Sequence, residues 1–122
     1  ERIEAVQRDP ELLAGLVERG MLSQITGGSI VGHFGGPVRR LTHALLRRGL
    51  AHIIASDTHT PSGPRSPELS ACLKAAAEIV GEERARALVV DTPKAVLEDV
   101  TVDPEPPRVD PRPRRWWRMW RS

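Results

Sequence analysis

The stretch that decides the fold of this 122-residue chain is an apolar run that ends in a carboxylate and an imidazole, Ala51-His52-Ile53-Ile54-Ala55-Ser56-Asp57-Thr58-His59. A short apolar run of this kind predicts a buried strand. Side chains alternate between the two faces of a strand, so Asp57 shares a face with Ile53 and Ala55, and His59 joins them if the chain stays extended. Two ligand-type side chains are therefore expected together where the strand meets solvent.

The end of such a strand is where α/β folds place their functional sites. A carboxylate offers a hard oxygen and a neutral imidazole offers a nitrogen, and this mixture suits Zn²⁺, Mn²⁺ or Fe²⁺ better than a cysteine-rich structural site would. In the structural alternative, Asp57 caps a turn and His59 is solvated. The spacing of the two residues leaves both interpretations open.

Patterns on both sides of this stretch predict helices that alternate with short strands. Asp9 and Pro10 are typical of a helix start, and Gly49 is typical of the residue that follows a helix. We expect a strand over 21–26 and helices over 9–19, 37–48, 66–80, 82–89 and 92–99. This alternation favours an α/β fold over an all-β fold or a helical bundle.

The glycine-rich segment 27–36 has the outer glycine spacing of a phosphate-binding Walker loop. However, His33-Phe34 stands where that loop needs Lys-Ser/Thr, which excludes the assignment. We expect a flexible loop between strand and helix, with His33 as a loop histidine and not a ligand.

Several other reactive or charged side chains have simple structural interpretations. His43 is expected to face solvent from the helix over 37–48, and Arg47 and Arg48 are expected to be solvated near the negative end of the helix dipole. Cys72 has no basic neighbour in a loop and no paired histidine motif, so it is interpreted as a structural residue and not as a nucleophile.

Bulk composition excludes several classes of protein. The length allows one domain at most, and the net charge of +2 does not predict a nucleic-acid binder. A single cysteine excludes an internal disulfide framework and suits a reducing cytoplasm. No signal peptide and no apolar run of about 18 residues is present. The chain begins at Glu1 and not at Met, from which we expect that upstream sequence is missing.

Three segments together resemble a known family: Gly27-Gly28-Ser29-Ile30-Val31-Gly32-His33-Phe34-Gly35, Gly49-Leu50 followed by the decisive stretch, and Asp91-Thr92-Pro93-Lys94-Ala95-Val96-Leu97. They look like the carboxyl-terminal half of the bacterial capsular and exopolysaccharide tyrosine-protein phosphatases. These are metal-dependent members of the PHP (polymerase and histidinol phosphatase) superfamily. The run HIIASDTH resembles the family's last metal-binding motif. The resemblance implies that residues 1–100 form the carboxyl-terminal portion of a distorted (β/α)7 PHP-type barrel.

The resemblance also implies roles for particular residues. Asp57 and His59 match metal ligands, and Mn²⁺ is the family's usual metal, with Zn²⁺, Fe²⁺ and Mg²⁺ as alternatives. Arg2 and Arg65 match arginines that contact the phosphate, and a guanidinium can make two hydrogen bonds to phosphate oxygens. The expected substrate is a phosphotyrosine protein, namely the bacterial tyrosine autokinase that regulates polysaccharide assembly in the cytoplasm.

This chain departs from the family pattern because the amino-terminal His-x-His, further histidines and a glutamate have no counterpart. Two ligands cannot hold a site of two or three metals, so we expect a truncated fragment or a relic that is weakly active or inactive alone. Two alternatives remain: another PHP-type phosphoesterase, such as a histidinol-phosphate type, and a non-catalytic interaction module.

The second alternative depends on the carboxyl-terminal tail, residues 101–122. Prolines recur from Asp103 onward and predict an extended or disordered segment. The tail ends in Arg114-Arg115-Trp116-Trp117-Arg118-Met119-Trp120-Arg121. Arginine interleaved with tryptophan can bind an acidic partner or an anionic membrane surface. Nucleic acid, which such a mixture can also bind, is not the expected partner. The simpler alternative is an unstructured terminus.

Overall fold

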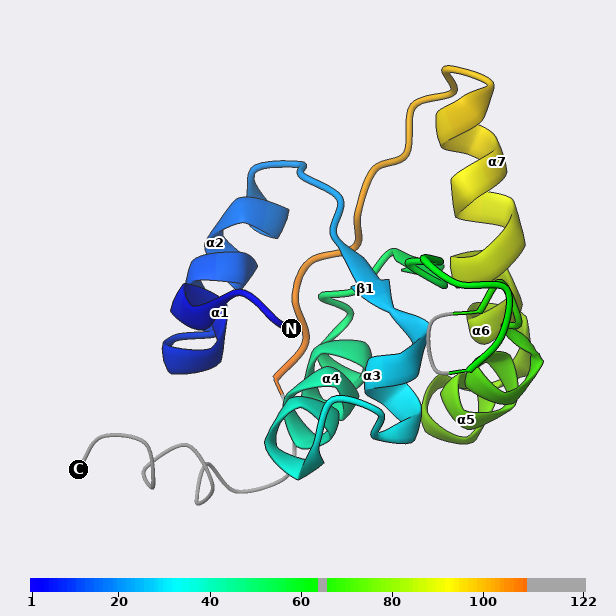
Figure 1. Cartoon of the computed structure of the whole chain (residues 1–122). Helices are drawn as coiled ribbons and strands as arrows, with labels where there is room; N and C mark the ends of the chain where they lie inside the picture. Colours follow the sequence, from blue (N-terminus) through cyan, green and yellow to red (C-terminus); the bar gives the residue numbers. More distant parts are fainter. Residues whose placement is uncertain (64–65, 110–122) are drawn as a thin grey trace.

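A computed structural model describes residues 1–63 and 66–109 of the chain (Figure 1). In order, its elements are α1 (Glu4–Arg8), α2 (Glu11–Glu18), β1 (Gln24–Thr26), α3 (Gly27–Val31), α4 (Gly36–Arg48), β2 (Ile53–Ala55), α5 (Ser70–Val80), α6 (Glu82–Arg86), the π-helical turn η1 (Ala87–Asp91) and α7 (Thr92–Leu97). The predicted mixture of helices and strands is confirmed. Within the described ranges, no helix has the length and apolar composition needed to cross a bilayer.

The two strands pair in parallel, with Ile25 opposite Ile54. Strand β1 is three residues long and shorter than the strand predicted over 21–26. The contact between the two chain segments begins at Ser23, whose backbone oxygen accepts hydrogen bonds from the N–H groups of His52 and Ile53. The N–H of Met21 instead donates to Leu16 O at the end of α2. The missing strand residues therefore belong to the helix end and to the connection that follows it.

Strand β2 is covered on one face by the helices that follow it in the chain. Ile54 is 2% exposed and belongs to a cluster with Ala76 of α5, Ala85 of α6 and Leu88 of η1. Burying these apolar side chains stabilises the packing of helix on strand. A second cluster joins α2 to α4 and is formed by Ala14, Val17, Leu41, Leu45 and Leu50.

The segment predicted to be a flexible loop, residues 27–36, instead begins with helix α3. A Cβ built on Gly27 would lie 2.9 Å from Cys72 Sγ, so glycine allows α3 to pack directly against α5. The helix ends at Gly32, whose φ of +95° is left-handed. The glycines thus permit close packing and helix termination, and only residues 32–35 form a connection.

Helix α4 lies close to its predicted bounds, and Gly49 follows it with a φ of +72°. Two expectations about its side chains are wrong. His43 does not face solvent, because it is half-buried and its Nε2 lies 2.9 Å from Ile30 O. Arg48 is not a solvated helix end: its side chain is 13% exposed and pairs with both carboxylate oxygens of Glu11 at 2.9 Å. Both positions are enclosed by neighbours distant in the sequence.

Helix boundaries elsewhere shift by a few residues. Helix α2 begins at Glu11, whose N–H donates to Asp9 Oδ1. Helix α5 begins at Ser70 and not at Ser66, and the N–H of Ser70 donates to Glu68 Oε1 at 2.6 Å. In both cases the carboxylate two residues earlier satisfies an N–H that has no partner within the helix.

Residues 101–109 form neither helix nor strand, as the prolines predict. Figure 1 shows this orange segment running from the end of α7 back toward α4. The backbone N–H of Arg108 donates to Arg48 O at 2.8 Å, and Arg48 Nε donates to Arg108 O at 3.2 Å. The arginine and tryptophan cluster over 114–121 lies outside the described residues.

Candidate metal and phosphate site

Asp57 lies two residues beyond the end of β2 and adopts a left-handed backbone conformation, with a φ of +54°. Such a conformation is uncommon for residues other than glycine, although aspartate tolerates it better than most. The chain therefore turns at Asp57 and does not remain extended to His59. Ser56 and Thr58 flank the turn, with their hydroxyl oxygens 2.6 Å apart.

This turn still places His59 beside Asp57. The ring Nδ1 of His59 lies 2.6 Å from the backbone oxygen of Asp57 and 3.9 Å from its Oδ1. A carbonyl oxygen only accepts hydrogen bonds, so Nδ1 is the donor and Nε2 is the nitrogen with a lone pair. A histidine that donates one ring N–H to a carbonyl is typical of metal sites, because this contact orients the other nitrogen.

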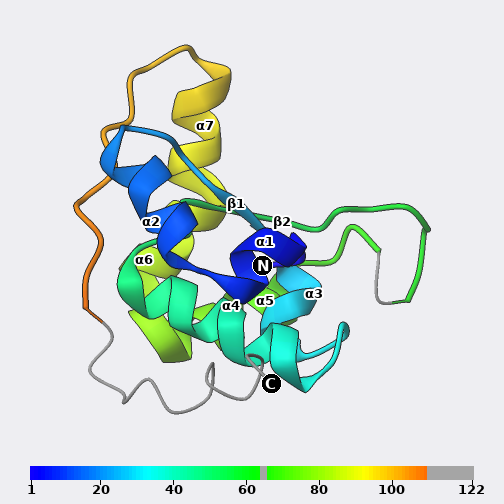
Figure 2. The ribbon, with the colours of Figure 1, turned by 90° about the vertical axis from the view of Figure 1, so that its left-hand side faces the viewer.

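Arg2 reaches the same place from the beginning of the chain. Its Nη1 donates to Asp57 Oδ2 at 3.0 Å, although the two residues are 55 positions apart. Its guanidinium carbon lies 4.5 Å from the ring centroid of Phe34, which is cation–π distance. Figure 2 shows α1 and the N-terminus on the side of the molecule where the two strands end. The structure thus brings together Arg2, Asp57 and His59.

Two contributors to this arrangement were missed in the sequence. Glu1 Oε1 accepts from Ser29 Oγ at 2.7 Å and from the N–H of Thr26 at 3.2 Å, which ties the residue before Arg2 to the end of β1. Ser29 is fully buried. Phe34 supports Arg2 from the connection after α3. The only available signals were that Glu1 adjoins Arg2 and that Phe34 is the single phenylalanine of the chain.

The side chains at this site meet part of the requirements of a metal centre. Asp57 and His59 supply an oxygen and a nitrogen suited to a divalent transition metal. Across residues 1–63 and 66–109, no group of three or more His, Cys, Asp or Glu side chains is arranged to hold a metal ion. The pair therefore fits part of a coordination sphere, and a complete centre needs additional donors. Arg65, the second expected phosphate arginine, lies outside the described residues.

Cys72 packs against Gly27 of α3 and is not suited to act as a nucleophile. It is 6% exposed, and burial raises the pKa of its thiol. Because the thiolate is the reactive form of cysteine, a raised pKa keeps the side chain unreactive at neutral pH. This result agrees with the structural role that the sequence predicted.

Known proteins with similar sequences share a common description. The Staphylococcus aureus protein named "Putative tyrosine-protein phosphatase CapC" is 43% identical over 60 residues, which are 49% of this chain and 24% of CapC. The tyrosine-protein phosphatase YwqE of Bacillus subtilis is 42% identical over 59 residues, which are 48% of this chain and 23% of YwqE. The aligned part of this chain therefore covers about a quarter of the length of each relative.

A solved structure extends this similarity to the fold. It comes from work on YwqE from Bacillus subtilis and CpsB from Streptococcus pneumoniae, described as unique metal-dependent tyrosine phosphatases. The match has a TM-score of 0.79 and 31% identity, and it covers 91% of this chain and 44% of the solved chain. The family described as "Capsular polysaccharide synthesis, CpsB/CapC" matches residues 1–98. From this match and the shared fold, the chain belongs to the CpsB/CapC family of capsular polysaccharide synthesis.

Proposed function

We propose that this chain provides the carboxyl-terminal portion of a PHP-type barrel that hydrolyses phosphotyrosine in proteins with the help of a divalent metal. Asp57 and His59 are metal ligands in this proposal, and Arg2 and Arg65 bind the phosphate. The observation that supports it best is the 3.0 Å contact between Arg2 and Asp57, because it joins a phosphate-type cation to a metal-type carboxylate across 55 positions.

The side chains have distinct tasks in this reaction. The guanidinium of Arg2 offers parallel N–H donors to two phosphate oxygens and neutralises charge on the phosphoryl group. Phe34 and Asp57 hold the guanidinium in place before substrate binds. Nε2 of His59 would bind the metal, because the contact of Nδ1 with the backbone oxygen of Asp57 orients the ring. A bound metal would supply an activated water and additional positive charge.

The substrate we propose is a phosphotyrosine protein of capsule or exopolysaccharide synthesis, with a tyrosine autokinase of the cytoplasm as the first candidate. Mn²⁺ is the metal to test first. Because the described residues offer only part of a coordination sphere, the chain alone is expected to hydrolyse phosphotyrosine weakly or not at all.

The test measures Mn²⁺ binding by calorimetry and phosphotyrosine-peptide hydrolysis, with histidinol phosphate as the competing substrate. It compares this chain with a version extended upstream along its gene, each with and without Asp57→Ala. Asp99→Ala is a matched control, because Asp99 also has a left-handed φ, of +55°. Both substitutions therefore place alanine in the same strained conformation, and only one removes a proposed ligand.

We expect activity in the extended version, and we expect Asp57→Ala to lower Mn²⁺ affinity and activity by at least tenfold while Asp99→Ala retains both. Faster turnover of histidinol phosphate than of the phosphotyrosine peptide would favour the other PHP-type phosphoesterase. If Asp57→Ala and Asp99→Ala behave alike, the assignment of Asp57 is wrong.

A further inference from the structure

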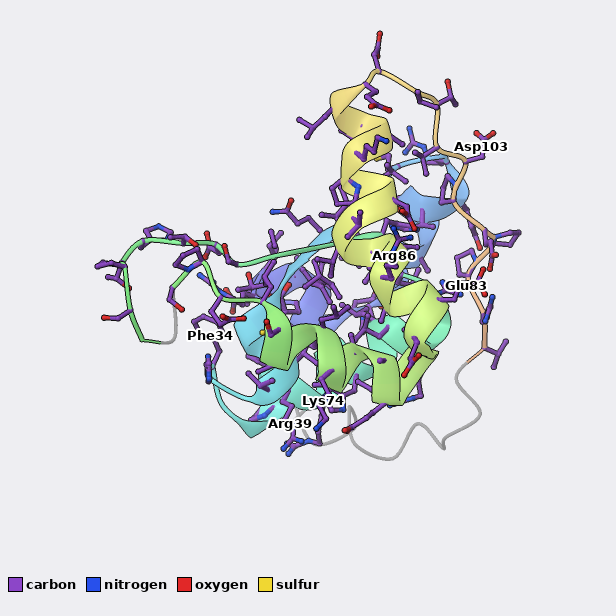
Figure 3. All side chains as sticks on the ribbon, turned by 90° about the vertical axis from the view of Figure 1, so that its right-hand side faces the viewer. Phe34, Arg39, Lys74, Glu83, Arg86 and Asp103 are labelled. Atoms are coloured by element: carbon purple, nitrogen blue, oxygen red, sulfur yellow. The ribbon has the colours of Figure 1, made fainter. Side chains whose placement is uncertain are left out.

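A cavity of about 220 Å³ lies between α3, the end of β2 and the beginning of α5. Most of its surface is apolar and comes from residues such as Val31, Leu69, Ala71 and Cys72, and the polar residues of the lining are His33, Ser56, Ser66 and Glu68. Figure 3 looks onto α5 and shows the chain after β2 projecting from the edge of the molecule where Phe34 lies. Because Ser56 directly follows β2 and lines the cavity, the cavity lies at the same end of the sheet as the candidate phosphate site.

The size of the cavity limits what it can hold. A cavity of about 150 Å³ lined by apolar side chains is enough to bind benzene. At about 220 Å³, this one accommodates a single leucine-sized or phenyl-sized group but not a cofactor. Its lining is suited to an apolar side chain and offers little to a charged one.

The cavity and the candidate phosphate site share structural elements. Ser56 lines the cavity, and the next residue, Asp57, contacts Arg2. Gly28 also lines the cavity, and a Cβ built on it would lie 3.2 Å from Phe34 Cε2, on the ring that supports Arg2. One ligand could therefore reach both places.

The cavity and the candidate phosphate site at Arg2 are suited to different parts of one ligand. Ser56 and Asp57 are consecutive, and one lines the cavity while the other contacts Arg2. A phosphoryl group at Arg2 is therefore close to the cavity. In an extended peptide, successive residues are about 3.3 Å apart along the chain, so a neighbour of the phosphorylated residue can reach an adjacent pocket.

We propose that this cavity is a specificity subsite for an apolar side chain next to the phosphotyrosine of the substrate, an inference that rests on the proposed function. Glu68 also lines the cavity, but it is exposed to solvent, so its charge restricts the incoming side chain little.

The test uses the full chain labelled with ¹⁵N and follows backbone amide shifts. The probes are inorganic phosphate, N-acetyl-leucine amide, and phosphotyrosine peptides with leucine or serine on either side of the phosphotyrosine. We expect N-acetyl-leucine amide and the leucine peptides to shift the amides of Val31, Leu69, Ala71 and Cys72. We expect one leucine peptide to bind roughly tenfold more tightly than its serine counterpart, as burial of one leucine side chain allows.

Ala71→Trp and Val31→Phe fill the cavity from opposite walls, and each should remove the preference for leucine while leaving the binding of the serine peptide unchanged. Glu78→Trp is the control, because Glu78 lies on α5 like Ala71 but is exposed and outside the cavity lining. This variant should retain the preference for the leucine peptide. The melting temperature of each variant shows that it is folded.

The two ideas fail in different ways. If N-acetyl-leucine amide shifts none of the four amides and the leucine and serine peptides bind equally, the subsite does not exist. If N-acetyl-leucine amide shifts them but neither inorganic phosphate nor any phosphopeptide shifts Arg2 or Asp57, the apolar site stands and its link to phosphotyrosine is overturned, whereas the proposed function fails only if the extended version lacks metal-dependent phosphotyrosine hydrolysis.

Discussion

The imidazole of His52 makes the stability of this fold depend on pH. The residue is 8% exposed, and its Nδ1 accepts a hydrogen bond from the backbone N–H of Ser23 at 3.0 Å. An accepting nitrogen has no proton, so the native ring is neutral. Burial, and then the positive charge of Arg84, lower the pKa of His52 below its ordinary value of 6.5. Protonation would remove the acceptor and place a cation in the interior.

The sign and size of the effect follow from proton binding. Below pH 6.5 the unfolded chain binds a proton at His52 that the native chain does not, so the free energy of unfolding falls as pH falls toward the native pKa. One proton limits the slope to about 1.4 kcal/mol per pH unit. Above about pH 7.5 this residue contributes no slope. Glu68 and Glu105 also have lowered pKa values, but theirs lie below 4.5 and outside this range.

The assay is urea unfolding at intervals from pH 7.5 to pH 5.0, with His52→Asn for comparison. The amide oxygen of asparagine can take the place of Nδ1 as acceptor and does not titrate in this range. We expect the native chain to lose stability over this range and His52→Asn to lose less, while the exposed control His33→Asn keeps the native slope. Equal slopes for His52→Asn and the native chain would refute the reasoning.

Three further predictions concern packing and reactivity. Gly49→Ala should lower the free energy of unfolding by about 1–2 kcal/mol, because the φ of Gly49 is left-handed at +72°. Gly15→Ala should raise the free energy of unfolding by about 0.5–1 kcal/mol, because Gly15 lies inside α2 and has open space around it. Chemical denaturation measures both changes. Arg48→Met should lower the free energy of unfolding by about 1–2 kcal/mol, because the arginine side of its ion pair with Glu11 is largely shielded from solvent. A double-mutant cycle with Glu11→Gln should show a coupling energy well above that of an exposed ion pair. The thiol of Cys72 should react with Ellman's reagent only on unfolding; rapid labelling of the native chain at pH 7.5 would contradict its buried position.

Helix positions were predictable where local signals coincide with the packing. The apolar spacing over 37–48 and the glycine after it placed α4 almost correctly, because helix periodicity and a left-handed terminal residue are local properties. The loop predicted over 27–36 failed because glycine is ambiguous. Gly27 is needed for the approach of α3 to Cys72, and no local pattern reveals that contact.

The candidate site divides in the same way. The sequence identified Asp57 and His59 as neighbours but left open whether the chain between them is extended or turns, and the left-handed φ of Asp57 decided this only in the structure. It proposed Arg2 by resemblance alone, and the contact with Asp57 across 55 positions depends on the fold. The pairing of β1 with β2 brings Arg2 to the end of β2, because Glu1 is held at the end of β1.

The sequence by itself determined the alternation of helix and strand, the identity of the ligand-type residues and the family. These follow from side-chain periodicity and from motifs that are contiguous along the chain. The tertiary structure alone decided that His43 and Arg48 are enclosed, that Phe34 supports Arg2, and that a cavity adjoins the site. The physical reason is that burial, ion pairing and cavity shape depend on groups distant in the sequence, which become neighbours only when the helices pack on the strands.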